Sequence, residues 1–239
     1  MSVRLDQSLV NRGLVSTRSQ AESYIKLGKV KVDGQVITKP GEKTLKNAVV
    51  RLTTLKTYVS RGGLKLESVA DKFNLTFAGQ AILDVGSSTG GFSDYALQHG
   101  AAKVIAVDIG KQQLAEPLRT NPKVELHEQT DIMDVDSLST KINMVLIDVS
   151  FTSIKPVLEH LLSLLPPGCI VVGMVKPQFE ARKSLKHKGV IKNQTVRRNI
   201  LKDFEKWVIS KYKILDKADS GVAGEKGNLE RFYKLVVLA

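Results

Sequence analysis

Short apolar segments that alternate with helix-like segments are the feature that most constrains how this chain can fold. Between residues 82 and 175, the runs ILDV, KVIAVD, VELHE, MVLIDV and CIVVGMV have the length of buried strands, and segments such as GFSDYALQHG separate them. This alternation is typical of a parallel sheet covered by helices on both faces. YKILDKADS and RFYKLVVLA then follow each other without a helix, so we expect an antiparallel pair at the edge of the sheet.

The first 54 residues have a different pattern, which predicts a small α+β domain. Leu5 and Leu9 lie on one face of a first helix, and a second helix is expected from Ser16 or Thr17 up to Gly28. Asp33-Gly34 between short alternating segments indicates a hairpin. We therefore expect a small domain over residues 1–54, a linker over 55–60 and an α/β domain over 61–239.

The basic residues are concentrated in two blocks. Residues 1–60 hold 11 Lys/Arg against 4 Asp/Glu and residues 176–217 hold 13 against 4, whereas residues 61–175 hold 9 against 13. A solvated surface would account for many of these lysines, but two separate blocks favour a polyanionic partner, with nucleic acid the leading candidate.

Several classes of protein are disfavoured by what the sequence lacks. It contains no apolar run of about 18 residues, and its first residues lack the apolar core of a secretory signal. The single cysteine, Cys169, lies in an apolar stretch and is expected to be a buried thiol, and the four histidines show no zinc spacing. We expect a cytoplasmic protein without a membrane-spanning segment or a bound metal.

The glycine-rich loop in ILDVGSSTGGF narrows the choice of ligand. Gly86 is followed by two serines, so the second glycine of the dinucleotide fingerprint is missing, and Phe92-Ser93 stand where a P-loop needs Lys and Ser/Thr. S-adenosylmethionine, which carries no phosphate, fits this loop better. A Rossmann-like sheet with an antiparallel edge also points to methyltransferases rather than dehydrogenases. The expected contacts are Asp84, Gly86, Ser87, Gly90, Gly91 and Phe92.

Two further acids follow the next strands. Asp108 ends the strand KVIAVD, where a carboxylate binds the ribose hydroxyls of a nucleoside cofactor, although NAD uses the same position. Asp131 follows the third strand and is either a contact of the adenine amino group or an ordinary surface acid.

Candidate catalytic residues stand at the carboxyl ends of the later strands. Asp148 follows MVLI and Lys176 follows CIVVGMV, where neither is readily explained as a core residue. A weakly acidic hydroxyl needs a base to become a methyl acceptor, and a lysine can serve when neighbouring cations and desolvation lower its pKa. Taken singly, Lys65 and Glu230 would be solvated charges.

The N-terminal pattern resembles the S4 RNA-binding domain. The matching residues are Arg4-Leu5-Asp6, Gly13, Thr17-Arg18, Ala21 and the stretch from Gly28 to Gly34, in which Asp33 replaces the usual Asn. The resemblance implies RNA binding, and the basic residues that we expect to contact RNA are Arg4, Arg12, Arg18, Lys26, Lys29 and Lys31. In the second basic block they are Arg182, Lys183, Lys186 and Lys188.

The order Lys65, Asp148, Lys176, Glu230 resembles the Lys-Asp-Lys-Glu tetrad of FtsJ-type ribose 2′-O-methyltransferases. An S4 domain ahead of SRGGLKL, DVGSSTGGF, DVSF, VKPQFE and GNLE is similar to the TlyA, or hemolysin A, family of rRNA 2′-O-methyltransferases. The resemblance implies a class I methyltransferase domain with a mixed seven-stranded sheet, S-adenosylmethionine without an obligatory metal, and a cytidine of 16S or 23S rRNA as target. It also implies that Lys176 is the base, and that Ser150 and Phe151 line the substrate side.

The sequence departs from the family at a few positions. Lys56-Thr57-Tyr58-Val59 stands where the family's linker has Arg-x-Trp-Val, and Ile191-Lys192-Asn193 with Arg197 replaces a Val-Arg-Asp and His pattern. The alternative functions are a non-catalytic RNA-binding or ribosome-assembly factor, a membrane-active hemolysin, and a methyltransferase of bases or proteins. The expected partner is ribosomal RNA or a ribosomal subunit.

Overall fold

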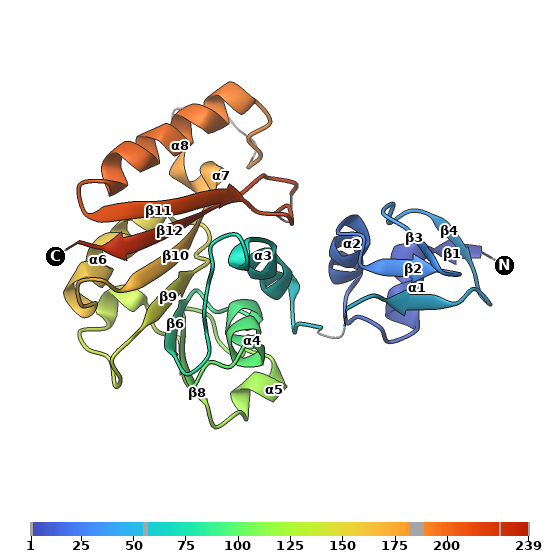
Figure 1. Ribbon diagram of the computed structural model, residues 1–239, viewed down its shortest axis with the longest axis horizontal. Helices are drawn as coiled ribbons and strands as arrows, with labels where there is room; N and C mark the ends of the chain where they lie inside the picture. Colours follow the sequence, from blue (N-terminus) through green and yellow to red (C-terminus); the bar gives the residue numbers. More distant parts are fainter. Residues whose placement is uncertain (1, 55–56, 182–188, 225, 239) are drawn as a thin grey trace.

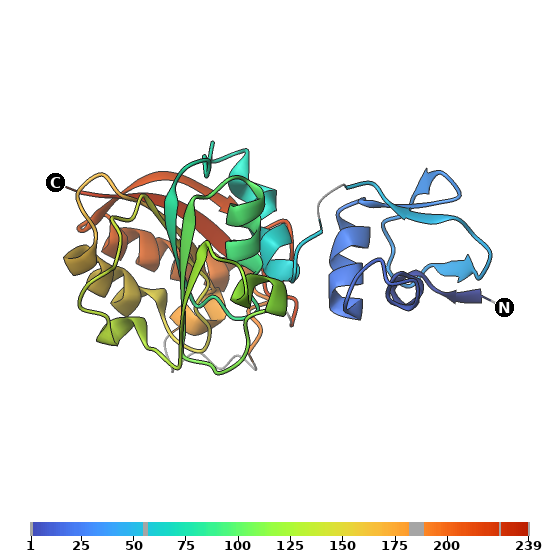
Figure 2. The same ribbon diagram turned by 90° about the horizontal axis from the view of Figure 1, so that it is seen from below.

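The computed structural model describes residues 2–54, 57–181, 189–224 and 226–238. Figure 1 shows a small body built from the N-terminal elements beside a larger α/β body, with the chain crossing once from one to the other. The view from below in Figure 2 shows the same side-by-side arrangement, with the two chain ends at opposite ends of the molecule.

The small domain consists of two helices and two short sheets. Thr17 is the N-cap of the second helix, and its side chain accepts a hydrogen bond from the backbone N–H of Gln20. The predicted hairpin is present, with Asp33 and Gly34 both at positive φ, as a tight two-residue turn requires. The elements are β1 (Ser2–Arg4), α1 (Leu5–Asn11), α2 (Arg18–Lys26), β2 (Val30–Val32), β3 (Gln35–Val36), β4 (Lys43–Leu45) and β5 (Val50–Leu52).

The larger domain contains the predicted mixed seven-stranded sheet, in the order β11-β12-β10-β9-β6-β7-β8. Five strands are parallel, whereas β12 pairs antiparallel with both β10 and β11. The predicted antiparallel pair at the edge is therefore confirmed, with β11 outermost. The strands are β6 (Ala81–Val85), β7 (Lys103–Asp108), β8 (Val124–Glu128), β9 (Met144–Ile147), β10 (Ile170–Val175), β11 (Tyr212–Asp219) and β12 (Arg231–Val237).

Helices cover both faces of this sheet because successive strand residues point to opposite sides. On one face Ile82, Met144 and Val172 pack with α3 (Arg61–Ala70) and α4 (Gly91–Gln98). On the other face Leu83 and Val145 pack with α6 (Ile154–Leu164) and α8 (Gln194–Val208). The remaining helices are short: α5 (Glu116–Arg119), the 3₁₀ turn η1 (Ile132–Asp134) and α7 (Pro177–Glu180).

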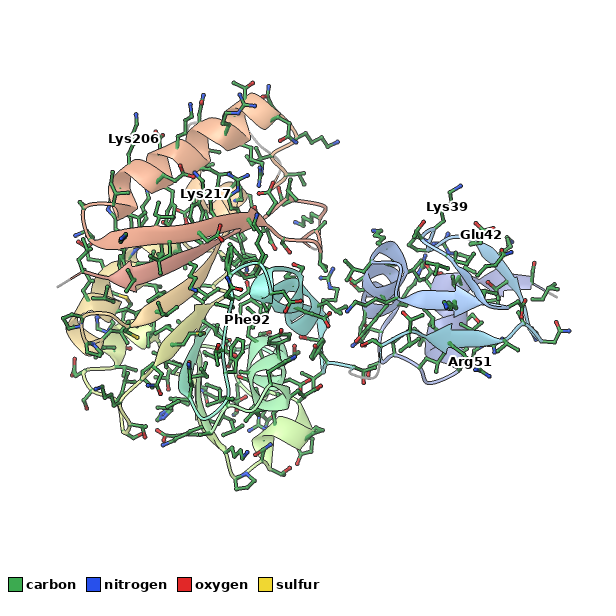
Figure 3. The ribbon with its side chains drawn as sticks, viewed as in Figure 1. Lys39, Glu42, Arg51, Phe92, Lys206 and Lys217 are labelled. Atoms are coloured by element: carbon green, nitrogen blue, oxygen red, sulfur yellow. The ribbon has the colours of Figure 1, made fainter. Side chains whose placement is uncertain are left out.

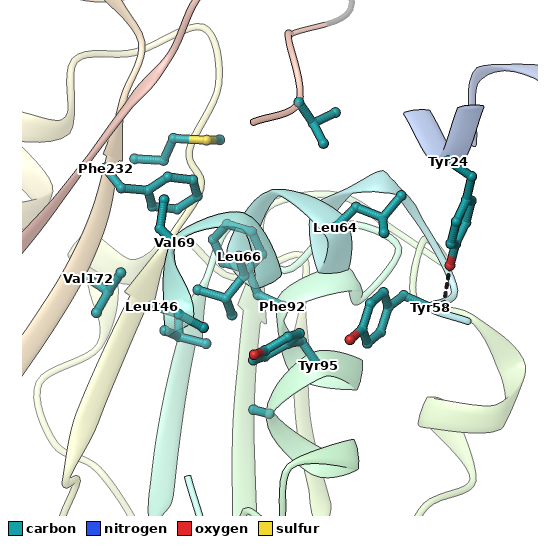
Figure 4. Close-up of a cluster of buried hydrophobic side chains, with 14 of the residues drawn as sticks. Tyr24, Tyr58, Leu64, Leu66, Val69, Phe92, Tyr95, Leu146, Val172 and Phe232 are labelled. Carbon is teal, nitrogen blue, oxygen red and sulfur yellow. Dashed lines mark hydrogen bonds between the residues drawn. The ribbon is translucent and has the colours of Figure 1, made fainter. Parts of the chain in front are cut away.

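A buried aromatic contact joins the two domains. The backbone N–H of Tyr58 donates to Tyr24 Oη at 3.3 Å, and the Tyr58 carbonyl accepts from Gln20 Nε2 at 2.6 Å. Figure 4 shows Tyr24, Tyr58 and Tyr95 continuing into the cluster around Leu66 and Phe232 in the larger domain. The hydrophobic core therefore extends through Tyr58 into the small domain.

Exposed lysines of both domains point away from this core. Figure 3 shows Lys206 directed outward from the larger domain and Lys39 outward from the small one, whereas Phe92 lies inside. Within the part of the chain that the structure describes, no helix is long and apolar enough to cross a membrane.

Candidate active site

A cavity of about 700 Å³ lies where the parallel strands of the larger domain end. The loops that follow β6, β9 and β10 line it, and so does the segment that precedes β12. Because β12 runs antiparallel to β10, with Arg231 opposite Val175, its first residues lie at the same edge as the ends of its neighbours. This topology brings together Lys65, Asp84, Asp148, Lys176 and Glu230, all expected from the sequence to be functional.

Lys176 lies at the centre of one polar group in the cavity. Its Nζ is 2.5 Å from Asp148 Oδ1 and donates to Ser150 Oγ at 2.7 Å, and the Lys176 side chain is only 7% exposed. Lys176 occupies the N-cap position of α7, where strand β10 turns into that helix. A buried amine between a carboxylate and a hydroxyl is placed to exchange a proton with a third polar group in the cavity.

Lys65 and Glu230 form a second buried ion pair. Lys65 Nζ donates to Glu230 Oε2 at 2.6 Å, and the two side chains are 10% and 4% exposed. Lys65 comes from α3 and Glu230 from the residue before β12, 165 positions later in the chain. Neither is an ordinary solvated charge, and both line the same cavity as Lys176.

Two of the loop glycines pack closely against neighbouring segments of the chain, where a side chain would collide. Gly86 has φ +79°, and a Cβ built there would lie 3.0 Å from the Asp148 carbonyl oxygen. At Gly91 a Cβ would lie 2.8 Å from Gly62 Cα, where α4 meets α3. Both glycines line the cavity. Gly90 also allows close packing, because a Cβ there would collide with Leu118 and Leu114, but it is not among the residues that line the cavity.

Two polar atoms of the loop region are buried without a hydrogen-bond partner among the described residues. They are Asp84 Oδ1 and Ser87 Oγ, and both residues line the cavity. The other oxygen of Asp84 accepts from the N–H and the hydroxyl of Ser93, at 2.9 and 2.6 Å. Burial raises the pKa of Asp84 to about 7, and the charges of Asp148 and Asp108 act in the same direction. Buried unpaired polar atoms of this kind are usually completed by a ligand or water.

The two acids after the next strands lie outside the lining of this cavity. Asp108 accepts hydrogen bonds from the N–H groups of Ser88 and Gly110, both at 2.7 Å. It thereby ties the glycine-rich loop to the end of β7. Asp131 is exposed and caps η1 by accepting from the Met133 N–H at 3.0 Å.

The small domain holds a compact pair of arginines. Asp6 is fully buried and accepts hydrogen bonds from Arg4 Nη2 at 2.7 Å and from Arg18 Nε at 2.9 Å. Burial on its own would raise the pKa of Asp6, but the hydrogen bonds from Arg4 and Arg18 outweigh it and lower that pKa. The two arginine side chains remain about half exposed, so Asp6 orients them at the surface.

The other basic residues expected to contact RNA have varied surroundings. Arg12 donates to the Lys46 carbonyl, Lys26 lies 3.7 Å from Glu22, and Lys31 is exposed on β2. Lys29 instead pairs with Glu67 of α3, so this lysine takes part in the contact between the domains. Arg182, Lys183, Lys186 and Lys188 lie outside the described residues.

Several residues at the site have no strong signal in the sequence. Ser93, in the first turn of α4, donates hydrogen bonds to Asp84 Oδ2 from its backbone N–H and its hydroxyl. Asn228 lines the cavity and holds the chain after residue 188, because its side chain bonds to Gly189 O at 2.8 Å and Ile191 N at 2.9 Å. Gln178 and Phe179 follow Lys176 in the cavity wall. Among the described residues, no three or more His, Cys, Asp or Glu side chains are grouped to hold a metal.

Two family models match the chain and leave few residues uncovered. The FtsJ-like methyltransferase model matches residues 58–235, and the S4 domain model matches residues 3–50. These matches confirm that the N-terminal part resembles the S4 domain and that the rest of the chain resembles FtsJ-type methyltransferases.

Named relatives extend over most of the chain. YqxC of Bacillus subtilis is 39% identical over 95% of this chain and 83% of its own length. TlyA of Mycobacterium tuberculosis is 38% identical over 75% of this chain and 69% of its own length. Hemolysin A of Brachyspira hyodysenteriae is 32% identical over 98% of this chain and its full length.

A solved structure agrees with these sequence matches. A candidate hemolysin from Streptococcus thermophilus superposes with a TM-score of 0.74 at 34% identity, covering 99% of this chain and 89% of that one. The chain therefore belongs to the FtsJ-like methyltransferase family, in the group that includes TlyA and hemolysin A, and carries an S4 domain before its methyltransferase domain.

Proposed function

We propose that this protein transfers a methyl group from S-adenosylmethionine to the ribose 2′-hydroxyl of a cytidine in ribosomal RNA, in the cytoplasm. The observation that supports it most is the pairing of Lys176 with Asp148 and Ser150 in the same cavity as the Lys65–Glu230 pair. TlyA of M. tuberculosis is named a 16S/23S rRNA (cytidine-2′-O)-methyltransferase, and TlyA of Campylobacter jejuni is named for 23S rRNA. We further propose that residues 55–60 link a small domain, 1–54, to the methyltransferase domain, 61–239.

The residues around the glycine-rich loop fit the proposed cofactor. When bound, S-adenosylmethionine supplies an electrophilic methyl group on a sulfonium. The buried, unpaired Oδ1 of Asp84 is an acceptor for an ammonium group, and Gly86 and Gly91, which line the cavity, are proposed to bring the loop backbone close to the ligand. Ser87 and Phe92 complete this part of the wall. Asp108 and Asp131 are proposed for the ribose and adenine end.

The amine of Lys176 is proposed to accept the proton of the 2′-hydroxyl. Asp148, 2.5 Å from the amine, would stabilise the ammonium that results, and Ser150 would orient it. The Lys65–Glu230 pair would fix the opposite wall and hold the hydroxyl by hydrogen bonds. Orientation of the nucleophile is the main requirement of such a displacement.

The direct test is to incubate the purified protein with methyl-labelled S-adenosylmethionine and separated ribosomal subunits. We expect label in RNA from one or both subunits and, after digestion to nucleosides, recovery of the label as 2′-O-methylcytidine. A parallel reaction with protein-free rRNA shows whether the assembled subunit is needed. Label on a base or on protein, or no label in any RNA, would contradict the proposal.

The hemolysin name of one relative raises the membrane-active alternative, and the assembly-factor alternative needs no chemistry. Neither requires two buried Lys–carboxylate pairs in one cavity, whereas ribose methylation gives both a role. The comparisons with TlyA likewise favour methyl transfer over these alternatives.

The raised pKa of Asp84 predicts that cofactor binding depends on pH. Below about pH 7 the free protein holds Asp84 mainly as the neutral acid, which must lose its proton to pair with an ammonium group. Binding should therefore tighten as the pH rises, by roughly 20-fold between about pH 5.5 and about pH 7.5, and then level off. Calorimetric titration with S-adenosylmethionine across this range measures the effect.

Asp84→Asn is the matched control for this prediction. The amide cannot ionise, so binding should be weak and almost independent of pH over the same interval. An Asn variant with the same pH dependence as the natural protein would show that another group is responsible.

The arginine pair on Asp6 predicts a phosphate contact in the small domain. Arg18→Ala should weaken binding to rRNA and reduce the slope of log Kd against log salt concentration by about 1, as expected for one lost phosphate contact. Lys123 is an exposed residue just before β8, the edge strand farthest from β11, and Lys123→Ala should leave the slope unaltered. Equal slopes for the Arg18 variant and the natural protein would show that Arg18 makes no phosphate contact.

A further inference from the structure

Gln178 presents an unsatisfied polar atom in the wall of the candidate active site. It lies on α7, two residues after Lys176, and lines the same cavity. Its Oε1 is buried and has no hydrogen-bond partner in the described part of the chain. Leaving a buried carbonyl oxygen unpaired costs free energy, so such an atom in a cavity points to a donor supplied by a ligand.

Aromatic rings stand next to Gln178. The ring of Phe179 lies 5.4 Å from the ring of Phe151, and both residues line the cavity. Phe151 is 92% exposed and has φ +66°, a backbone conformation that is rare and costly for a bulky residue. An exposed ring packed against a second, half-buried ring beside a polar group is an arrangement that enzymes use to hold an unstacked base.

A buried carboxylate fixes these groups relative to each other. Glu180 of α7 accepts from Ser153 Oγ at 2.6 Å and from the Ile154 N–H at 2.7 Å, and so ties α7 to the loop that carries Phe151. Burial raises the pKa of Glu180. Gln178 is therefore held on a supported element rather than on a free loop.

We propose that Gln178 reads the target base, by accepting a hydrogen bond from the cytosine N4 amino group through Oε1 and donating one to cytosine N3 through Nε2. This assignment rests on the proposed function. With the carboxamide turned so that Oε1 and Nε2 both face the base, uracil would present an acceptor to an acceptor and a donor to a donor. Gln178 is thus assigned as the residue that distinguishes cytidine from uridine, separate from the groups that move the proton.

The test uses transcripts of the rRNA segment that the labelling experiment identifies, with the methylated cytidine either kept or replaced by uridine. The natural protein should prefer the cytidine transcript in kcat/KM by about 10- to 100-fold, the range expected for a bidentate base contact. Gln178→Ala should lower kcat/KM on the cytidine transcript to nearly that on the uridine transcript, which should itself change little. Gln178→Glu, which keeps only acceptors, opposes N3 of cytosine just as it opposes O4 of uracil, so it should be slower and should lose most of the preference for cytidine.

Two controls separate this proposal from simpler explanations. Cofactor binding by the Gln178 variants should match that of the natural protein, and Gln194→Ala, an exposed change on α8, should alter neither rate nor preference. If Gln178→Ala slows both transcripts equally or leaves the preference intact, the assignment is overturned while the proposed function stands. If the natural protein methylates no RNA, the proposed function itself fails.

Discussion

Lys176→Met should reduce methyl transfer to rRNA by about 10²- to 10⁴-fold, which is the usual contribution of a positioned general base. Methionine retains the length and apolar stem of lysine but has no amine to accept the 2′-hydroxyl proton. Because the amine acts in the chemical step, the loss should fall on kcat. The change also leaves Asp148 without its partner at 2.5 Å. Single-turnover reactions with labelled cofactor and saturating rRNA measure the chemical step directly.

Binding of the cofactor is the first control for this variant. Lys176 contacts Asp148 and Ser150 rather than the glycine-rich loop, so the affinity for S-adenosylmethionine should remain within a few-fold. Lys206→Met, an exposed change on α8, should retain the full rate. A Lys176 variant within tenfold of the natural rate would exclude this lysine as the base.

Glu230→Ala should destabilise the methyltransferase domain by about 3–5 kcal/mol, the range for removing one partner of a buried ion pair. The reason is that Lys65, only 10% exposed, would be left as an unpaired charge inside the protein. Denaturant titration followed by the fluorescence of Trp207 measures this loss, because the chain contains a single tryptophan and it packs in this domain.

A surface pair supplies the matched control for Glu230. Glu159 lies 2.7 Å from Lys211 but is 60% exposed, so Glu159→Ala should cost at most about 1 kcal/mol. The double variant Lys65→Met/Glu230→Leu removes both charges and should recover most of the stability while remaining inactive. If Glu230→Ala costs no more than Glu159→Ala, the buried pair does not have the energetic role assigned to it.

Local patterns in the sequence predict those parts of the fold that depend on local chemistry. The Thr17 cap and the Asp33-Gly34 hairpin depend on residues a few positions apart. The alternation of strand and helix likewise predicts the parallel part of the sheet. Asp148 and Lys176 could be placed together because the carboxyl ends of neighbouring parallel strands meet at one edge.

Contacts between distant segments are not predictable in this way. The pairing of β1 with β4 joins two three-residue strands about 40 positions apart, too short to show a periodicity. The partner of Lys29 is Glu67, so a residue that reads as a free cation lies at the domain contact. Gly90 belongs to the same glycine-rich run as Gly91, yet its role depends on Leu114 and Leu118, which only the folded chain brings close.

The insertion of β12 between β10 and β11 has a consequence for synthesis. A nascent chain that has emerged as far as residue 219 contains both basic blocks and the whole small domain, but it lacks Glu230 and the strand that joins β11 to the sheet. The small domain can therefore emerge well before the last strand is made, whereas the cavity wall that carries Glu230 closes only after translation reaches β12. Under the proposed function, an incomplete chain would carry the candidate RNA-binding residues of the small domain without a complete catalytic cavity.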